Sequence, residues 1–158
     1  MPPHIRDIRK HIGHAPLFIN AAAAIIADAQ GKIVLQLRGG PGEADDQWSL
    51  PGGLMEVGER ASDTAVREAK EETGLDIALL DFVGVYSTPE LVRYPNGDEC
   101  HMITQIFSAR ITGGTLTADG NETRRLAFFE LDSRPVLFRP HLERALTDFA
   151  AGRRGVSD

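Results

Sequence analysis

The chain has 158 residues, of which 42% are hydrophobic and 25% are charged, and its formal net charge is −6. This balance is typical of one globular domain and excludes a disordered chain, a collagen and a protein built from membrane-spanning helices. The acidic charge disfavours a nucleic-acid partner, and a lone Cys100 excludes an intramolecular disulfide and a cysteine metal cluster, which fits the cytoplasm.

A short helix and a pair of strands are predicted at the N-terminal end of the chain. Three isoleucines recur at helical spacing within residues 1–14, which predicts a helical extension there. Two apolar segments follow, residues 17–27 and 32–38, and we expect them to form strands joined by a turn at residues 28–31. Residues 39–46 are expected to form a loop.

The rest of the chain predicts one long helix, further strands and a closing helix. The long helix is expected at residues 63–73, with Ser62 as its N-cap and Gly74 as its stop signal. The remaining expectations are loops at 51–61 and 87–98, strands at 75–86, 100–111 and 126–130, a turn at 112–114, a helix at 139–151 and a flexible tail at 152–158. This order predicts a single domain over residues 1–158, of the α/β (α+β) class, with a mixed β-sheet flanked by helices.

The helix expected at residues 63–73 carries three glutamates on one face. With Glu68 placed at 0° around the axis of a helix of 3.6 residues per turn, Glu72 lies at about 40° and Glu71 at about −60°. Glu68 and Glu72 repel each other weakly, and a divalent cation between them would reverse the sign of that interaction. Oxygen ligands of this kind suit Mg²⁺ or Mn²⁺. A solvated acidic surface is the competing interpretation of the helix taken alone.

The residues around these glutamates form a longer pattern. Its positions are Gly53, Glu59, Arg67, Glu68, Glu71, Glu72, Gly74 and Leu75. The pattern resembles the Nudix box of the Nudix hydrolase family, the MutT-like pyrophosphohydrolases, and Ala69 is a small residue in a hydrophobic position of that box. Residues 17–38, 48–53 and 126–132 resemble the first strands, the entry to the box and the late strand of the same family.

The resemblance implies an α/β/α sandwich and the chemistry of the family. That chemistry is the hydrolysis of a nucleoside diphosphate linked to another group, by water attack on phosphorus, with Mg²⁺ as cofactor and Mn²⁺ as an alternative. The implied catalytic metal ligands are Glu68, Glu71, Glu72 and the carbonyl of Gly53. The implied supporting residues are Arg67, which would hold a carboxylate, and Gly52, Glu59 and Gly74, which would orient the box.

The general base and the substrate stay open. Glu122, in the loop 117–125, is a candidate base beside the box glutamates, and a plain surface acid is the alternative interpretation. The candidate substrate contacts are Arg38, Trp48, Tyr86 and Arg93. The expected substrate is a nucleoside diphosphate sugar such as ADP-ribose, or a (d)NTP, and Pro89 gives a weak indication of the former because ADP-ribose-cleaving members often carry a proline near this position.

Two other functions compete with the enzyme. One is a non-catalytic nucleotide or ADP-ribose sensor on the same fold, which would be expected to have lost box carboxylates, whereas none is missing here. The other is a structural acidic module with a coincidental pattern. The expected partner is a small nucleotide, with neither nucleic acid nor membrane, and a homodimer through the N-terminal helix is left open.

Overall fold

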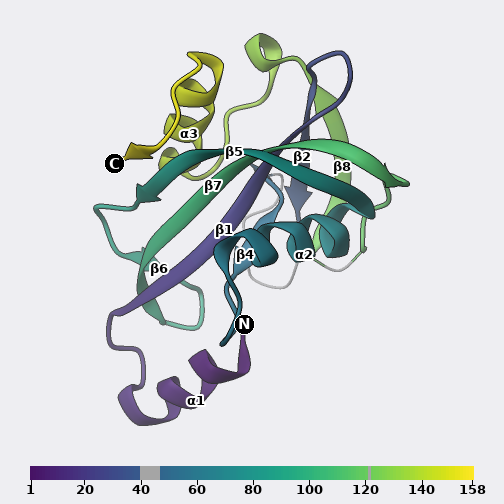
Figure 1. Ribbon diagram of the computed structural model, residues 1–158. Helices are drawn as coiled ribbons and strands as arrows, with labels where there is room; N and C mark the ends of the chain where they lie inside the picture. Colours follow the sequence, from purple (N-terminus) through teal and green to yellow (C-terminus); the bar gives the residue numbers. More distant parts are fainter. Residues whose placement is uncertain (40–46, 121) are drawn as a thin grey trace.

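The computed structural model describes residues 1–39, 47–120 and 122–158, and a mixed sheet lies at its centre (Figure 1). The helices are α1 (Pro3–Ile12), α2 (Ala61–Thr73) and α3 (Pro140–Ala150), with a short 3₁₀ turn at Leu131–Ser133. The strands are β1 (Leu17–Ala27), β2 (Ile33–Arg38), β3 (Trp48–Ser49), β4 (Gly52–Leu54), β5 (Leu75–Ser87), β6 (Val92–Arg93), β7 (Glu99–Gly114), β8 (Thr123–Phe129) and β9 (Val156–Ser157). No helix in the described ranges is long and apolar enough to cross a membrane.

The centre of the sheet is a parallel pair, β1 and β7, which run side by side along the whole of β1. The strand order is β3-β2-β1-β7-β5-β9, and three short or lateral strands join it where β4 pairs with β1, β6 with β7 and β8 with β2. Apart from the parallel pairs β1–β7 and β5–β9, the neighbours are antiparallel. The mixed sheet confirms the predicted fold class.

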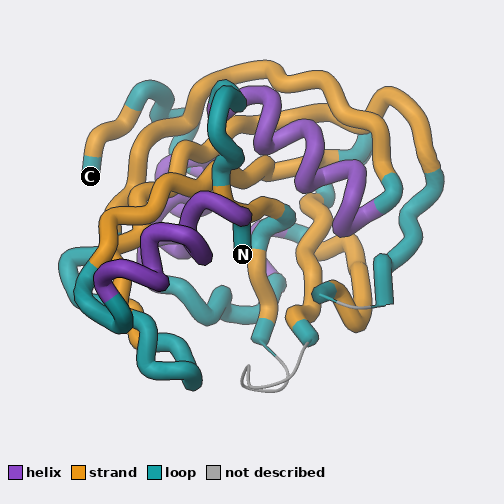
Figure 2. Tube along the Cα trace, turned by 90° about the horizontal axis from the view of Figure 1, so that it is seen from below, coloured by secondary structure: helices purple, strands orange, loops and turns teal. Residues whose placement is uncertain are grey.

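Side-chain alternation along β1 divides the core into two layers. Ala23 and Ile25 belong to the layer beneath α3, whereas Ala24 and Ile26 belong to the layer that contains Ala69 of α2. The two helices therefore cover opposite faces of the sheet, as Figure 1 shows. Figure 2 shows α1 on the same side of the molecule as α2. The alanines of β1, which are weak strand formers, occupy the strand because both of its faces are buried and the covering helix packs closely on small side chains.

The start of α2 differs from the prediction. The helix begins at Ala61 after Arg60, so Ser62 lies inside it and is not the N-cap. The Asp63 carboxylate accepts a hydrogen bond from the Arg60 backbone N–H at 3.4 Å, and this contact fixes the earlier start. Gly52–Leu54 is also a strand, where a loop was expected, because it pairs with β1.

Three other segments differ from their predicted boundaries. β7 continues through the turn expected at residues 112–114, and β8 begins at Thr123, three positions before its predicted start. In place of the flexible tail expected at 152–158, β9 adds to the sheet beside β5, with Val156 paired to Gly84. Residues 40–46 of the expected loop 39–46 lie outside the described residues.

Candidate active site

A cleft of about 610 Å³ opens where β1 changes neighbours. β2 meets β1 where Ala27 pairs with Ile33, and β4 lies beside β1 along residues 21–23. The divergence of β2 and β4 leaves a hollow whose lining includes Arg38 of β2, and its floor is formed by the small side chains of β1. The α2 glutamates Glu68, Glu71 and Glu72 all line this cleft. The structure thus brings the three predicted metal ligands to one place.

Arg67 holds the acidic side of the cleft together. Its Nε and Nη2 atoms donate to the two carboxylate oxygens of Glu59 at 2.7 and 3.0 Å. Its Nη1 donates to Glu68 at 2.7 Å and to Glu71 at 3.1 Å, and Nη2 also donates to the Leu54 carbonyl at 3.2 Å. One planar guanidinium therefore joins the loop before α2, the helix itself and β4, which requires the fixed fork of arginine.

Glu72 is the buried member of the cluster, with 4% of its surface exposed. Its Oε2 atom accepts hydrogen bonds from the Gly52 backbone N–H at 2.8 Å and from the Gln36 side-chain amide at 2.9 Å. Burial raises the pKa of Glu72 to about 8, and these two donors and Arg38 only partly offset that cost, while Glu68 adds to it. A buried carboxylate of this kind is stabilised in its charged form by a nearby cation.

The surroundings shift the pKa values of Glu59 and Glu68 in opposite directions. The hydrogen bonds from Arg67 lower the pKa of Glu59 to about 2, so Glu59 is a permanent anion that orients the arginine. Burial raises the pKa of Glu68 above its ordinary value, although Arg67 opposes the shift. The two inner carboxylates, Glu68 and Glu72, thus carry an electrostatic cost that Glu59 does not.

Two consecutive glycines allow β4 to approach its neighbours closely. A Cβ added at Gly53 would lie 2.5 Å from the carboxylate carbon and one oxygen of Glu68, and a Cβ at Gly52 would lie 2.4 Å from the Ala23 Cβ and 2.5 Å from the Ala22 carbonyl oxygen. Glycine at position 53 therefore lets the Glu68 carboxylate rest against the backbone, beside the carbonyl predicted as a ligand. Gly74 ends α2 in the left-handed conformation, with φ of 73°.

The donor set fits a hard divalent cation. It consists of carboxylate oxygens, and the surroundings disfavour the charged forms of Glu72, which is buried, and of Glu68, which is partly buried. In the arrangement seen across the described residues, no three His, Cys, Asp or Glu side chains converge closely enough to enclose an ion. The reason lies in the contacts above, because Arg67 engages Glu68 and Glu71 while Glu72 is bonded to Gly52 and Gln36.

The structure separates the remaining candidates into two groups. Arg38 and Glu122 line the cleft with the α2 carboxylates, and Asp119 accompanies Glu122, whose backbone N–H donates to Asp119 at 3.2 Å. Glu122 is exposed, and its charge contributes to the raised pKa of Glu68. The Arg38 guanidinium lies 5.7 Å from the centre of the Phe138 ring.

Three predicted substrate contacts lie outside the lining that the described residues give the cleft. Trp48 packs edge-on against Phe129, with ring centres 4.9 Å apart. Tyr86 is fully buried, and its hydroxyl donates to Asp148 of α3 at 2.9 Å, so the structure places it in the core. Arg93 is exposed and pairs with Glu99 at 2.8 Å. The prediction of Tyr86 as a candidate substrate contact is corrected on this ground, because no face of its ring reaches solvent.

Sequence reasoning missed the residue that orients Glu72. Gln36 is fully buried on β2, donates from its amide to Glu72 and to the Leu50 carbonyl, and accepts at 2.6 Å from the Thr123 hydroxyl. Its three bonds fix the amide, and the amide in turn fixes the carboxylate. The available signal was a polar side chain between Leu35 and Leu37, within the apolar part of the strand.

Comparison with known proteins gives three findings. The NUDIX domain model matches residues 17–149. An ADP-ribose pyrophosphatase of Methanocaldococcus jannaschii is 34% identical over 153 residues, which cover 95% of this chain and 83% of the relative. A Bacillus subtilis protein provisionally named as an 8-oxo-dGTP diphosphatase is 39% identical over 110 residues, 70% of this chain and 68% of the relative.

A solved structure shows the same fold. The NUDIX hydrolase of Nitrosomonas europaea superposes with a TM-score of 0.69, over 88% of this chain and 93% of that one. The two sequences are 21% identical, so this likeness concerns the fold alone.

Proposed function

This chain belongs to the Nudix hydrolase family and is a pyrophosphohydrolase, and we propose that it cleaves a nucleoside diphosphate linked to another group with the help of Mg²⁺, or Mn²⁺. The proposed substrate is a nucleoside diphosphate sugar such as ADP-ribose, or a (d)NTP. The name of the archaeal relative supports the first class and that of the Bacillus relative supports the second. The archaeal match extends over more of the chain, which favours the first.

One observation carries the proposal: three glutamates of α2 line a cleft of nucleotide size beside two glycines. Glu68, Glu71 and Glu72 would hold the metal together with the Gly53 carbonyl. A metal ion bound there neutralises phosphate oxygens and lowers the pKa of water. Because the carboxylates and the ion compensate each other, the net charge of −6 does not prevent an anionic substrate from binding.

The protein's own residues would position the reactants. Gln36 and the Gly52 N–H hold Glu72, and Arg67 holds Glu59, Glu68 and Glu71. The Arg67 contacts to Glu68 and Glu71 would have to rearrange for the α2 glutamates to enclose an ion, whereas Glu72 is already oriented by its two donors. Glu122 is the proposed acceptor of the proton from the attacking water, with a box glutamate as the alternative. Its exposure and its place on the cleft wall support this role.

The test is product analysis on a substrate panel with and without Mg²⁺. The panel contains ADP-ribose, a nucleoside diphosphate glucose, a dinucleoside polyphosphate, GTP and dGTP, and it is run on the wild type and on Glu72→Gln. We expect metal-dependent release of a nucleoside monophosphate and a decrease in kcat of at least about a hundredfold in the variant, or roughly 2.7 kcal/mol of barrier. Glu130→Gln, at an exposed carboxyl that pairs with Lys32, is the matched control and should keep the wild-type rate.

Two outcomes would contradict parts of the proposal. An unchanged rate in Glu72→Gln would refute the assignment of Glu72 as a metal ligand. Ligand-induced increases in melting temperature without turnover, in excess Mg²⁺ or Mn²⁺, would instead favour the nucleotide sensor.

A homodimer and a cytoplasmic location complete the proposal. On α1, Ile5 is buried against its own chain, whereas Ile8 and Ile12 are 39% and 40% exposed and offer apolar surface to a second copy. Light scattering of the wild type and of the Ile8→Glu, Ile12→Glu double variant tests this, with a halved mass expected for the variant. The single cysteine, Cys100, is buried and free, which suits a reducing compartment.

A further inference from the structure

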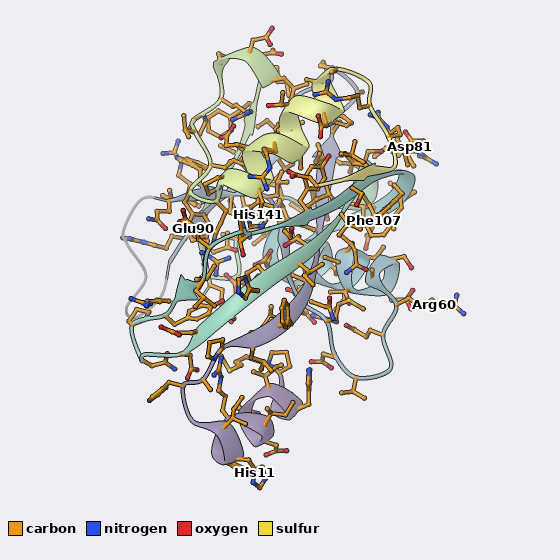
Figure 3. The ribbon with its side chains drawn as sticks, turned by 90° about the vertical axis from the view of Figure 1, so that its left-hand side faces the viewer. His11, Arg60, Asp81, Glu90, Phe107 and His141 are labelled. Carbon is orange, nitrogen blue, oxygen red and sulfur yellow. The ribbon has the colours of Figure 1, made fainter. Side chains whose placement is uncertain are left out.

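His141 is a buried polar residue that the chemistry described above does not use. It lies in the first turn of α3, is 3% exposed and lines the same cleft as the glutamates of α2. Figure 3 shows it between α3 and the strands of the sheet, near the centre of the molecule. Since α2 and α3 cover opposite faces of the sheet, a ligand that contacts both His141 and the α2 glutamates would extend through the cleft from one side to the other.

One ring nitrogen of His141 has a partner and the other does not. Nε2 lies 3.2 Å from the hydroxyl oxygen of Thr104 on β7, another residue of the cleft lining. Nδ1 is buried and has no hydrogen-bond partner among the described residues. Leaving a buried nitrogen unpaired costs free energy, and a ligand group in the cleft can recover it.

The surroundings keep this imidazole neutral. Burial lowers the pKa of His141 to about 4, and the charges of Arg139 and Arg144 add to that effect. In a neutral ring one nitrogen is a donor and the other an acceptor. The hydroxyl of Thr104 can take either role at Nε2, and the role it takes determines whether Nδ1 donates or accepts.

The neighbouring lining suits a flat aromatic group. Phe138, Tyr94 and Leu142 line the cleft together with His141, and the Arg139 guanidinium lies 4.6 Å from the centre of the Phe138 ring. Aromatic and apolar walls with one or two fixed polar atoms are the usual composition of a pocket that selects among planar ligands. Nucleobases are planar and differ in the donors and acceptors along their edges.

We propose that Nδ1 of His141 hydrogen-bonds the nucleobase of the substrate, and that Thr104 orients the ring so that this contact determines which base is preferred. The inference rests on the proposed function for its ligand class, a nucleotide. It adds a nucleobase subsite at the start of α3 to the diphosphate site on α2.

The experiment uses two histidine replacements that keep different nitrogens. The side-chain amide of Gln reaches the place of Nε2 and can keep the bond to Thr104, whereas that of Asn reaches only the place of Nδ1. Binding of AMP, GMP, CMP and UMP is measured by calorimetry without added divalent cation, on the wild type, His141→Gln, His141→Asn and Thr104→Val. His101→Gln is the matched control, because His101 stacks on Phe18 and lies outside the described lining of the cleft.

We expect the wild type to bind one of the four nucleotides at least about tenfold more tightly than the weakest. His141→Gln should reduce that ratio to within about threefold, and His141→Asn should retain more of it than His141→Gln. Thr104→Val should change the ratio without removing the ring, and His101→Gln should leave it as in the wild type. Circular dichroism and melting temperature verify that each variant is folded. If His141→Gln does not fold, the affinity ratios of Thr104→Val and His141→Asn test the inference in its place.

Three outcomes would overturn the inference. One is a wild type that binds all four nucleotides equally, another is an unchanged ratio in folded His141→Gln, and the third is a uniform loss for all four nucleotides, which is what a purely structural histidine would cause. The same variants assayed on ADP-, GDP-, CDP- and UDP-glucose with Mg²⁺ separate this inference from the proposed function. Hydrolysis with unaltered base ratios in the variants refutes the base contact alone, whereas a base preference in binding without any hydrolysis refutes the proposed function alone.

Discussion

Arg67 and Glu72 show how single side chains determine the electrostatic free energy of placing carboxylates in this cleft. Arg67 offsets the charge of three carboxylates at once, whereas Glu72 meets only neutral donors at hydrogen-bond distance and so keeps a raised pKa near 8. A carboxylate buried in this way destabilises the fold unless it is protonated or meets a cation. The chain thus accepts a cost in stability at the residue on which the proposed chemistry depends most.

His141 gives a prediction for the pH dependence of stability. Its folded pKa, about 4, lies below the ordinary value of 6.5. A depressed pKa means that the unfolded state binds the proton first, so the stability present above pH 6.5 decreases as the pH falls toward 4. The free energy of unfolding, measured with urea, should therefore decrease between pH 7.5 and pH 5 by about 2 kcal/mol more in the wild type than in His141→Gln. Equal losses in the two proteins would show that His141 is protonated as readily when folded as when unfolded.

The predictability of a site residue depended on whether its partners were local. Helical periodicity placed Glu68, Glu71 and Glu72 on one face, and the resemblance of the surrounding pattern to the Nudix box implied that they are metal ligands. The role of Gln36 depends on Thr123 and on α2, and the position of Tyr86 depends on Asp148 of α3. These contacts join segments that are far apart in the sequence, so no local sequence pattern predicts them.

Replacing the two glycines of β4 should have two different effects, a loss of activity at Gly53 and a loss of stability at Gly52. Gly53→Ala places a methyl group against the flexible end of Glu68, which can move aside, so we expect a loss of activity of at least about tenfold with a nearly unchanged melting temperature. Gly52→Ala places it against the backbone of β1, which cannot move, so we expect a loss of about 1–3 kcal/mol in unfolding free energy. Measuring kcat and urea midpoints for both separates the effects, and an inactive but fully stable Gly52→Ala would contradict this reasoning.

The C-terminal segment gives the next prediction. β9 pairs with β5, Arg144 contacts Asp158, and the Ser87 hydroxyl donates to the Asp158 carbonyl. Deleting residues 153–158 should lower the free energy of unfolding by about 1–2 kcal/mol, or roughly 5 °C in melting temperature. Asp158→Asn keeps the β9 strand, so its free energy of unfolding should decrease less than that of the deletion variant. A deletion with the melting temperature of the full chain would show that this segment is not part of the folded structure.

Elements were predicted where their own periodicity determines them. The sequence patterns located α1, β1 and α3 closely, because each buries one face or both along its length. β4 and β9 escaped prediction because each is a few residues long and exists only by pairing with a distant strand. The earlier start of α2 depends on an Asp63 contact that competes with the capping preference of Ser62.

A divalent cation should change the stability of the folded protein. If Mg²⁺ binds the folded state alone, a concentration ten times its dissociation constant adds about 1.4 kcal/mol. We expect the melting temperature to increase with Mg²⁺ in the wild type and much less in Glu72→Gln, measured against NaCl of equal ionic strength. If no ion alters the wild-type melting temperature, the glutamates of α2 are an acidic surface and not a binding site.

The parallel pairing of β1 and β7 determines when the cleft can form. Ala24 pairs with Phe107, 83 positions later, and α2 lies between them in the chain. Contacts between such distant segments form slowly, because a long loop must close before they contribute stability. During synthesis β1 has no β7 beside it until residues 99–114 emerge, and His141 and β9 follow later still. The cleft is therefore completed only after β7 and α3 have been synthesised, and a nascent chain that stalls after α2 carries the glutamates without the site.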